Sequence, residues 1–351
     1  MTSPERILIV RLSALGDVVM ASGLIRALAE RHPQAEISWL VEAPAAPLLK
    51  HNPRLKQVLI WPRAEWQALW RQRQWRALWQ SVATFRRMLR QQRFDWVLDA
   101  QGLLKSGLCA WMTGAPRRMG VLSREGSQSL MTEVITPPAG ADRRIAAEYR
   151  FAAEYLGVPK DSYRMDLAIG DAPAQAASQA LATLPAGKPV VALCPFTTRP
   201  QKHWFEDRWV ALAQGLIAQG PTPVVMGGPA DREAGERMAL ACPGLHNLAG
   251  ALKLDASAAF IGRCALLVGV DTGLTHMGTA LNVPTVALFG STRPYLTTGT
   301  PTTTVMYDAL PCSPCKRRPT CDGRFDCMRQ LTVDRVLMQA IQQWQGHSQV
   351  T

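Results

Sequence analysis

Three polar segments of this sequence each follow a short apolar run, and the strongest of them contains residues that could hold a phosphorylated ligand. The run 268–270 leads into Asp271, Thr272 and Gly273, and His276 follows about one helical turn later. A helix that starts here offers unpaired backbone N–H groups and the positive end of its dipole, which favour an anion such as a diphosphate. His276 could present a ring nitrogen to the same phosphate. Alternatively, Asp271 or Thr272 only caps the helix and His276 packs in the core.

Two further turns carry side chains with similar chemistry. Thr197, Thr198 and Lys202 follow the apolar run 190–194, and Asp231 follows a Gly-Gly-Pro-Ala turn. Hydroxyl and ammonium groups suit phosphate oxygens, and Lys202 could offset charge on a departing diphosphate. Asp231 could accept the ribose hydroxyls of a nucleotide. Each turn alone could be a solvated loop, but loops after neighbouring parallel strands meet, so together they predict a nucleotide-diphosphate site.

The first polar turn of the chain ends at Asp17, after the apolar run 7–10. It has neither the GxGxxG spacing nor the Walker pattern, so dinucleotide and ATP sites lose their main support. Asp17 would lie at a helix start above the first strand, where a general base for an acceptor hydroxyl could stand. An N-cap aspartate explains the residue equally well at this point.

The segment 61–93 interleaves arginine with tryptophan. Interfacial helices combine these residues because the rings lie at headgroup level while guanidinium groups meet anionic lipids. We interpret it as the face for an acidic acceptor and an anionic membrane, with Arg71, Arg73 and Arg76 toward the acceptor. A nucleic-acid site or a solvated helix with tryptophan at its core positions are the alternatives. No helix-turn-helix, OB or RRM motif accompanies the net charge of +12, so we do not expect nucleic acid.

Four cysteines near the C-terminus could bind a metal ion. Cys312, Cys315, Cys321 and Cys327 are spaced C-x2-C-x5-C-x5-C, and four thiolates this close together suit tetrahedral zinc or iron. The expected ion is structural, and no cofactor is expected to be required for catalysis. The other four cysteines stand singly in apolar segments and are expected in the core.

Two α/β domains are needed to position these residues. The chain has 351 residues, 47% of them apolar and 19% charged, which is too long for one average domain. Apolar runs alternate with helical periodicity in both halves, and the stretch 168–189, rich in Ala, Pro and Gly, has the composition of a linker. We predict Rossmann-like domains over 1–168 and 186–331, and a last helix in 332–351 that packs back on the first domain. The expected strands are 7–10, 37–41, 58–61, 96–98, 190–194, 223–226, 266–270 and 285–289, and the expected helices 18–31, 66–90, 103–112, 143–156, 205–219, from 231, 274–281 and 333–344.

The run 7–10 is too short for the core of a signal peptide. No uncharged apolar stretch approaches the roughly 20 residues that cross a bilayer. We therefore expect a cytoplasmic protein that is peripheral on the inner face of the inner membrane, where its positive charge favours anionic partners.

In combination, these motifs resemble glycosyltransferase family 9, the lipopolysaccharide heptosyltransferases. The likeness rests on Ser-Ala-Leu-Gly-Asp at 13–17, Asp-Ala-Gln-Gly-Leu-Leu-Lys-Ser at 99–106, Thr-Thr-Arg to Lys-His-Trp at 197–204 and Asp-Thr-Gly-Leu-Thr-His at 271–276. It spans most of the chain and is greatest for heptosyltransferase I, which adds the first heptose to Kdo-lipid A. It implies a GT-B fold, in which two Rossmann-like domains face each other across an interdomain cleft. It also implies an inverting transfer of heptose from ADP-L-glycero-D-manno-heptose to Kdo-lipid A or heptosyl-Kdo-lipid A.

The resemblance also implies roles for individual residues. Asp17 becomes the general base, and Lys202 becomes catalytic because it stabilises charge on the leaving ADP. The implied donor contacts are Thr197, Thr198, Lys202, Asp231, Asp271, Thr272, Gly273 and His276, and the implied acceptor contacts are Arg11, Arg71, Arg73, Arg76, Gln101, Lys105 and Arg124. The segment 123–127 and the cysteine tail depart from heptosyltransferase I, so the acceptor stays open. A transferase of the same fold with another nucleotide sugar or a protein acceptor, or a non-catalytic binding protein, remains the alternative.

Overall fold

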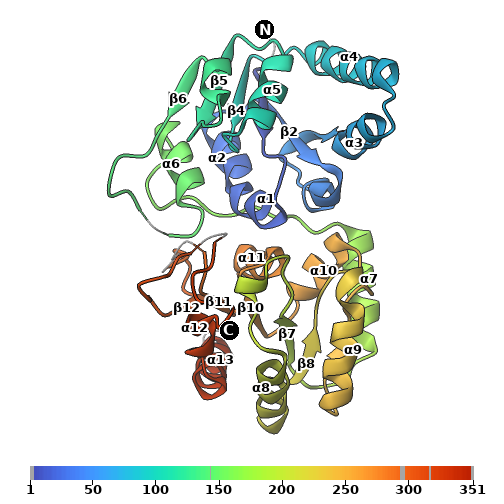
Figure 1. Ribbon diagram of the computed structural model, residues 1–351, viewed down its shortest axis with the longest axis vertical. Helices are drawn as coiled ribbons and strands as arrows, with labels where there is room; N and C mark the ends of the chain where they lie inside the picture. Colours follow the sequence, from blue (N-terminus) through green and yellow to red (C-terminus); the bar gives the residue numbers. More distant parts are fainter. Residues whose placement is uncertain (1–3, 143, 293–296, 316–317, 349–351) are drawn as a thin grey trace. The chain divides into compact units, whose positions relative to one another are not determined.

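The structure is a computed structural model that describes residues 4–142, 144–292, 297–315 and 318–348, and it divides into two compact units. The first unit extends to Ala168 and the second begins at Ile169, apart from a short segment near residue 145 that belongs to the second. Within the described residues, each unit contains a six-stranded parallel sheet with helices on its faces (Figure 1).

The sheet of the first unit has the strand order β3-β2-β1-β4-β5-β6. Its central strand, Ile-Leu-Ile-Val, is buried along its whole apolar run, as a parallel strand covered on both faces requires. The strands are β1 (Arg6–Val10), β2 (Glu36–Glu42), β3 (Leu55–Trp61), β4 (Trp96–Asp99), β5 (Arg117–Val121) and β6 (Glu133–Ile135). The sequence analysis did not anticipate β5 and β6.

Two helices expected in this unit are each divided in two. Two helices replace the one expected over 18–31, and they meet at Ser22. The Ser22 hydroxyl donates a hydrogen bond to the Val19 carbonyl and accepts one from the backbone N–H of Asp166. Arg73, with a positive φ of 56°, separates the two helices that replace 66–90. The helical segments are α1 (Leu15–Ala21), α2 (Gly23–Arg31), η1 (Ala43–Leu48), α3 (Arg63–Arg71), α4 (Trp75–Gln91), α5 (Leu104–Met112), η2 (Ser127–Leu130) and α6 (Ala147–Tyr155).

The sheet of the second unit has the order β12-β11-β10-β7-β8-β9, so β7 and β10 are neighbours at its centre. The strands are β7 (Val190–Cys194), β8 (Thr222–Val225), β9 (His246–Asn247), β10 (Leu266–Val270), β11 (Thr285–Phe289) and β12 (Thr303–Tyr307). The helical segments are α7 (Asp171–Ala182), η3 (Pro200–Lys202), α8 (Glu206–Ala218), η4 (Pro229–Asp231), α9 (Arg232–Ala241), α10 (Leu254–Ile261), α11 (Gly273–Ala280), α12 (Asp326–Arg329) and α13 (Val333–Ser348).

The linker expected over 168–189 is wrong for most of its length. Residues Asp171–Ala182 form α7, which packs against α10. The alanines that suggested a linker favour a helix and allow the close packing, so the second unit starts at Ile169 and not at residue 186.

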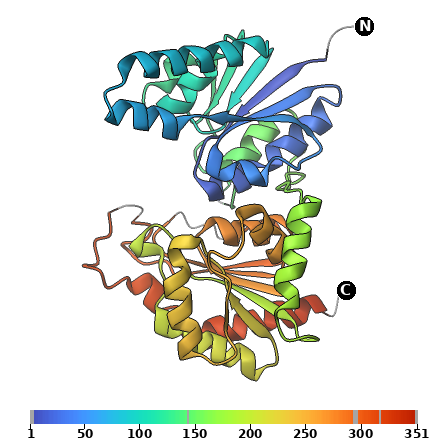
Figure 2. The same cartoon turned by 90° about the vertical axis from the view of Figure 1, so that its right-hand side faces the viewer.

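The expectation that the last helix packs on the first domain is also wrong. α13 lies against α8, β10 and β11 of its own unit (Figure 2). Val336 and Ala340 are fully buried in the core of the second unit. Gly215 of α8 allows this approach, since a Cβ there would come within 2.6 Å of Leu337. The apolar stripe of α13 therefore completes the core of the second unit.

Candidate functional site

Three residues expected near a diphosphate meet at the carboxyl end of the second sheet. Asp271 directly follows β10, Lys202 ends η3 after β7, and His276 lies in α11. The Lys202 Nζ atom lies 2.6 Å from Asp271 Oδ2, and His276 Nε2 lies 3.2 Å from Asp271 Oδ1. Because β7 and β10 are adjacent, the loops after them converge on Asp271.

Asp271 is held as a carboxylate by Lys202 and His276. Burial alone would raise its pKa, but the interactions with His276 and Lys202 outweigh burial and hold the pKa well below its ordinary value. The side chains of all three residues are largely buried. The Asp271 carboxylate therefore keeps its charge and position near neutral pH.

Thr292 is a member of this cluster that sequence reasoning missed. Its hydroxyl donates to Asp271 Oδ2 at 2.6 Å. It follows β11, the other neighbour of β10, and that position at the carboxyl edge of the sheet is the signal that could have found it.

The remaining expected donor residues lie in the loops after β7 and β8 or at the start of α11. Thr272 is the N-cap residue of α11 and Gly273 its first residue, both half-buried. The Thr197 carbonyl accepts from His203 Nε2 at 2.8 Å, and Thr198 is exposed. Asp231, after the neighbouring strand β8, accepts a hydrogen bond from the backbone of Gly228 at 2.8 Å.

In the first unit, Asp17 lies in the first turn of α1 and pairs with Arg11. The distance from Arg11 Nη2 to Asp17 Oδ2 is 2.7 Å, and the same oxygen accepts from the backbone of Ala14 at 3.2 Å. The Asp17 side chain is 34% exposed, whereas that of Arg11 is 11% exposed. Asp17 is the third residue of α1 and not its N-cap, which is Ala14; its carboxylate accepts from the N-cap backbone, so it closes its own turn and still reaches solvent.

A buried carboxylate, Asp99, shapes the loop that follows β4. Its oxygens accept from the backbone of Gln101 and Gly102 and from the hydroxyl of Ser106, at 3.0 to 3.1 Å. Burial raises the pKa of Asp99 to about 6, although these hydrogen bonds oppose the rise. The side chain of Gln101 in turn accepts from the backbone of Leu12 at 2.8 Å. The loop after β4 thereby supports the loop that carries Asp17.

Two of the expected acceptor contacts are occupied inside the protein. Arg11 and Gln101 are buried, with Arg11 on Asp17 and Gln101 on the backbone. Lys105 is partly exposed, contacts Ser13 Oγ at 3.0 Å and lies 3.5 Å from Glu42. The side chain of Arg124 is exposed. Lys105 and Arg124 are therefore accessible to an acceptor in the structure, whereas Arg11 and Gln101 are not.

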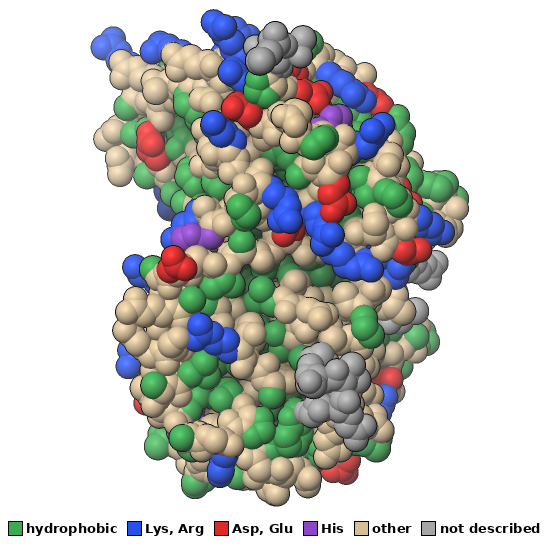
Figure 3. Space-filling model, turned by 180° about the vertical axis from the view of Figure 1, so that it is seen from behind, with side chains coloured by type: hydrophobic (Ala, Val, Ile, Leu, Met, Phe, Trp, Pro, Cys, Tyr) green, Lys and Arg blue, Asp and Glu red, His purple; other side chains and the backbone are tan. Residues whose placement is uncertain are grey.

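The α3–α4 segment, residues 63–91, exposes both arginine and tryptophan side chains to solvent. Arg71, Arg73 and Arg76 are exposed, and so are Trp70 at 63% and Trp79 at 73%. Other tryptophans of the segment pack inward: Trp66, for example, contacts Phe85. Figure 3 shows Lys and Arg side chains along the upper edge of the first unit. The alternative of a solvated helix with tryptophan at its core positions therefore describes Trp66 but not Trp70 or Trp79.

The four clustered cysteines differ in exposure. Cys312 is exposed, Cys315 half-buried, and Cys321 and Cys327 buried. Burial, and to a lesser degree the other three thiols, raise the pKa of Cys327 to about 11. Among the described residues, no group of three or more His, Cys, Asp or Glu side chains has an arrangement that could hold a metal ion. The four single cysteines are buried as predicted: Cys109, Cys194, Cys242 and Cys264.

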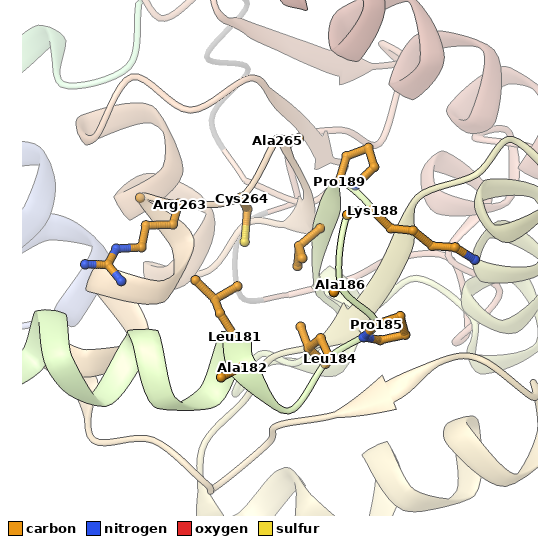
Figure 4. A pocket seen from close by; sticks show the side chains of 13 residues that line it. Leu181, Ala182, Leu184, Pro185, Ala186, Lys188, Pro189, Arg263, Cys264 and Ala265 are labelled. Carbon is orange, nitrogen blue, oxygen red and sulfur yellow. The ribbon is translucent and has the colours of Figure 1, made fainter.

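A cavity of about 500 Å³ lies at the opposite edge of the second sheet (Figure 4). It is lined by residues 184–190, before and at the start of β7, and by 262–265, before β10, with Lys188 and Arg263 at its rim. Asp271 and Lys202 follow the carboxyl ends of the same strands. The cavity is therefore separate from the cluster around Asp271.

None of the helices in the described part of the chain combines the length and apolarity needed to span a membrane.

The comparisons with known proteins agree with one another. The model of glycosyltransferase family 9 (heptosyltransferase) matches residues 82–324. Lipopolysaccharide heptosyltransferase 1 of Pseudomonas aeruginosa is 30% identical, over 93% of this chain and 92% of that protein. Lipopolysaccharide heptosyltransferase 2 of Escherichia coli is 29% identical, over 83% and 84%. The solved structure of Escherichia coli ADP-heptose LPS heptosyltransferase II superimposes with a TM-score of 0.76 at 25% identity and covers 98% of this chain and 99% of that one.

Proposed function

The chain belongs to glycosyltransferase family 9, and we propose that it transfers heptose from ADP-L-glycero-D-manno-heptose to an acidic lipopolysaccharide inner-core acceptor, Kdo-lipid A or heptosyl-Kdo-lipid A. The observation that carries the proposal is the cluster of Lys202, Asp271 and His276 at the carboxyl edge of the second sheet, where open α/β sheets bind ligands. Relatives that are named for both the first and the second heptosyltransferase have similar identities, so the proposal keeps both acceptors.

The donor diphosphate in this proposal binds at the N-terminus of α11, on Thr272, Gly273 and His276. Free N–H groups and the helix dipole favour an anion there. Lys202 now pairs with Asp271 at 2.6 Å, and a diphosphate would compete with that carboxylate for the ammonium group. Asp271 would then accept hydrogen bonds from hydroxyl groups of the heptose.

Contacts with the rest of the donor follow from neighbouring loops. Thr197 and Thr198 offer hydroxyls to the phosphates from the loop after β7. Asp231 offers its carboxylate to the adenosine ribose from the loop after β8.

The transfer itself is a single displacement. Asp17 takes the proton of the acceptor hydroxyl, whose oxygen bonds to the anomeric carbon while the bond from that carbon to the diphosphate breaks. ADP leaves with the electron pair, and Lys202 and His276 stabilise the charge that grows on it. One displacement inverts the anomeric configuration and needs no covalent intermediate. It also requires the two carboxyl edges to face each other across a cleft, as in a GT-B fold.

The α3–α4 segment supports an acidic acceptor and an anionic membrane as partners. Residues 66–94 contain seven arginines and no Asp or Glu, and a shallow cavity of about 580 Å³ on α4 is lined by Trp79 and several of these arginines. A solvated helix gains stability from opposite charges one turn apart, and this segment has none within it. Exposed tryptophan beside unbalanced arginine suits the headgroup region of a bilayer. We therefore place the protein on the inner face of the inner membrane.

The cysteine tail is proposed to hold a structural zinc or iron ion, apart from the transfer chemistry. Support comes from the chemistry of the four thiols and from their spacing in the sequence. Elemental analysis of protein purified without a metal-affinity tag should find about one metal ion per chain. No zinc or iron, together with four reactive thiols, would contradict it.

The donor assignment is tested by thermal shift with ADP, UDP, GDP and CDP. Ligands that bind only the folded state raise the melting temperature, so ADP alone should do so. Stabilisation by another nucleotide instead would indicate a transferase that uses a different sugar. No stabilisation by any of the four would favour a non-catalytic binding protein.

A further inference from the structure

Arg11 is a buried cation directed at the carboxylate of Asp17, and the displacement described above gives it no task. It is the residue that follows β1, and its side chain is 11% exposed. A buried guanidinium is costly unless it is paired, so an arginine held at this position needs a partner of opposite charge. Asp17 is that partner.

The sheet fixes the guanidinium before any substrate arrives. Arg11 Nη1 donates to the carbonyl of Ala100 at 3.1 Å, and its guanidinium lies 5.5 Å from the ring centre of Tyr149. Ala100 follows β4, the strand paired with β1, so the two loops lie side by side. Burial lowers the pKa of Arg11, but nearby Tyr149 and Asp17 outweigh it and raise the pKa, so the cation is permanent.

The contacts of Asp17 leave one of its oxygens for chemistry. Arg11 and the backbone of Ala14 both bind Oδ2, and no described residue is bonded to Oδ1. Two contacts on one oxygen fix the rotation of a carboxylate, which a partly exposed side chain would otherwise sample freely.

We propose that Arg11 is a positioning residue: it holds Asp17 through Oδ2 in the one orientation in which Oδ1 receives the acceptor proton. The proposal rests on the proposed function, in which Asp17 is the general base. It assigns Arg11 to the base, in place of the direct acceptor contact that the sequence predicted.

The test compares Arg11→Met, which keeps the length and loses the charge, with Arg11→Lys, which keeps the charge and loses the planar fork. Arg11→Met should lower kcat about tenfold to a hundredfold with little change in the KM for ADP-heptose. Arg11→Lys should recover part of the lost kcat. Arg118→Met is the matched control, because in the described structure the Arg118 side chain donates to the carbonyls of Ala115 and Leu130, and this variant should leave kcat unchanged.

Combining Arg11→Met with Asp17→Asn separates positioning from general stability. If Arg11 acts through Asp17, the double variant should be no slower than Asp17→Asn alone. Equal losses in both backgrounds, or wild-type kcat in Arg11→Met, would overturn the proposal while the general base stands. A fully active Asp17→Asn enzyme would overturn the general base and this proposal together. If Arg11→Met does not fold, Arg11→Lys decides, since a kcat loss in that variant that persists in the Asp17→Asn background contradicts the assignment.

Discussion

Each unit buries one carboxylate at the carboxyl end of a central strand, and the two carboxylates are held in opposite ways. Asp99 accepts from the neutral groups of Gln101, Gly102 and Ser106, and burial raises its pKa to about 6. Asp271 is paired with Lys202 and His276, which hold its pKa well below its ordinary value. Burial is similar in the two sites, so the partners decide the direction of the shift. Asp99 therefore supports a loop, whereas Asp271 holds the Lys202 and His276 side chains in place.

Asp17 differs from both, because it is partly exposed and has a single cationic partner. In the proposed function it is the carboxylate that takes the acceptor proton. The first unit would thus supply a base held by one arginine, and the second a cluster around Asp271. The following predictions test that division, from the largest expected effect to the smallest.

Replacement of Asp17 should have the largest effect on catalysis. Asp17→Asn keeps the shape and can still cap its turn, but it cannot take a proton at neutral pH. Turnover should fall at least about a hundredfold, while the melting temperature and ADP binding change little. ADP release and thermal melting check this. If the variant keeps more than about a tenth of wild-type turnover, Asp17 is only a cap.

Asp271→Asn should destabilise the second unit, because it leaves Lys202 buried without its counter-charge. The expected loss is about 4 kcal/mol, measured by denaturant unfolding at pH 7. A depressed pKa contributes stability above the unfolded value near 3.9 and loses it as the pH falls further, so the deficit should shrink only in strong acid. ADP affinity should fall as well, since Lys202 and His276 lose their anchor. A variant with wild-type stability at pH 7 would contradict the pairing.

Asp99→Asn should show the opposite pH dependence. A raised pKa contributes stability below the unfolded value near 3.9, and that contribution is lost as the pH rises through about 6. Relative to the wild type, the variant should therefore gain about 2 kcal/mol between pH 4 and pH 7. Unfolding curves at both pH values measure the difference. A difference that does not change with pH would show that Asp99 and Asp271 are not held in opposite ways.

The exposed arginines of the first unit should matter for the acceptor and not for the donor. A triple alanine variant should bind anionic liposomes and use the acceptor at least about tenfold less well, with ADP affinity nearly unchanged. The changes are Arg71→Ala, Arg73→Ala and Arg76→Ala, and a control with the same loss of charge elsewhere is Lys160→Ala, Lys188→Ala and Lys253→Ala. Equal loss of liposome binding in the control would show that the effect depends on net charge alone. Loss of ADP binding in the arginine variant would contradict the division between units.

The strands and helices around the predicted sites followed from periodicity, because apolar runs such as 7–10 and 266–270 are central strands buried on both faces. Short edge strands were missed: β6 and β9 hold three and two residues, too few for a pattern. α7 was missed because alanine and proline also occur in linkers. The packing partner of α13 was missed because an apolar stripe indicates that a helix is packed against a core but does not indicate which unit provides that core.

The candidate site was predictable where loops follow neighbouring strands. Lys202, Asp271 and His276 were expected together and are in contact. Thr292 was not expected, since a single threonine after a strand carries no pattern. The pairing of Arg11 with Asp17 could not be predicted from the sequence either. An arginine after a strand can be exposed to solvent or can form an internal ion pair. Only the packing of α6 and of the loop after β4 around Arg11 decides between these two environments.

The central claim is heptose transfer, and one measurement tests it most directly. Purified protein is incubated with ADP-L-glycero-D-manno-heptose and either Kdo-lipid A or heptosyl-Kdo-lipid A, and the acceptor mass and released ADP are measured. One of the two acceptors should gain the mass of one heptose, with an equal amount of ADP released. No mass gain on either acceptor, under conditions in which a heptosyltransferase of known activity modifies it, would contradict the account.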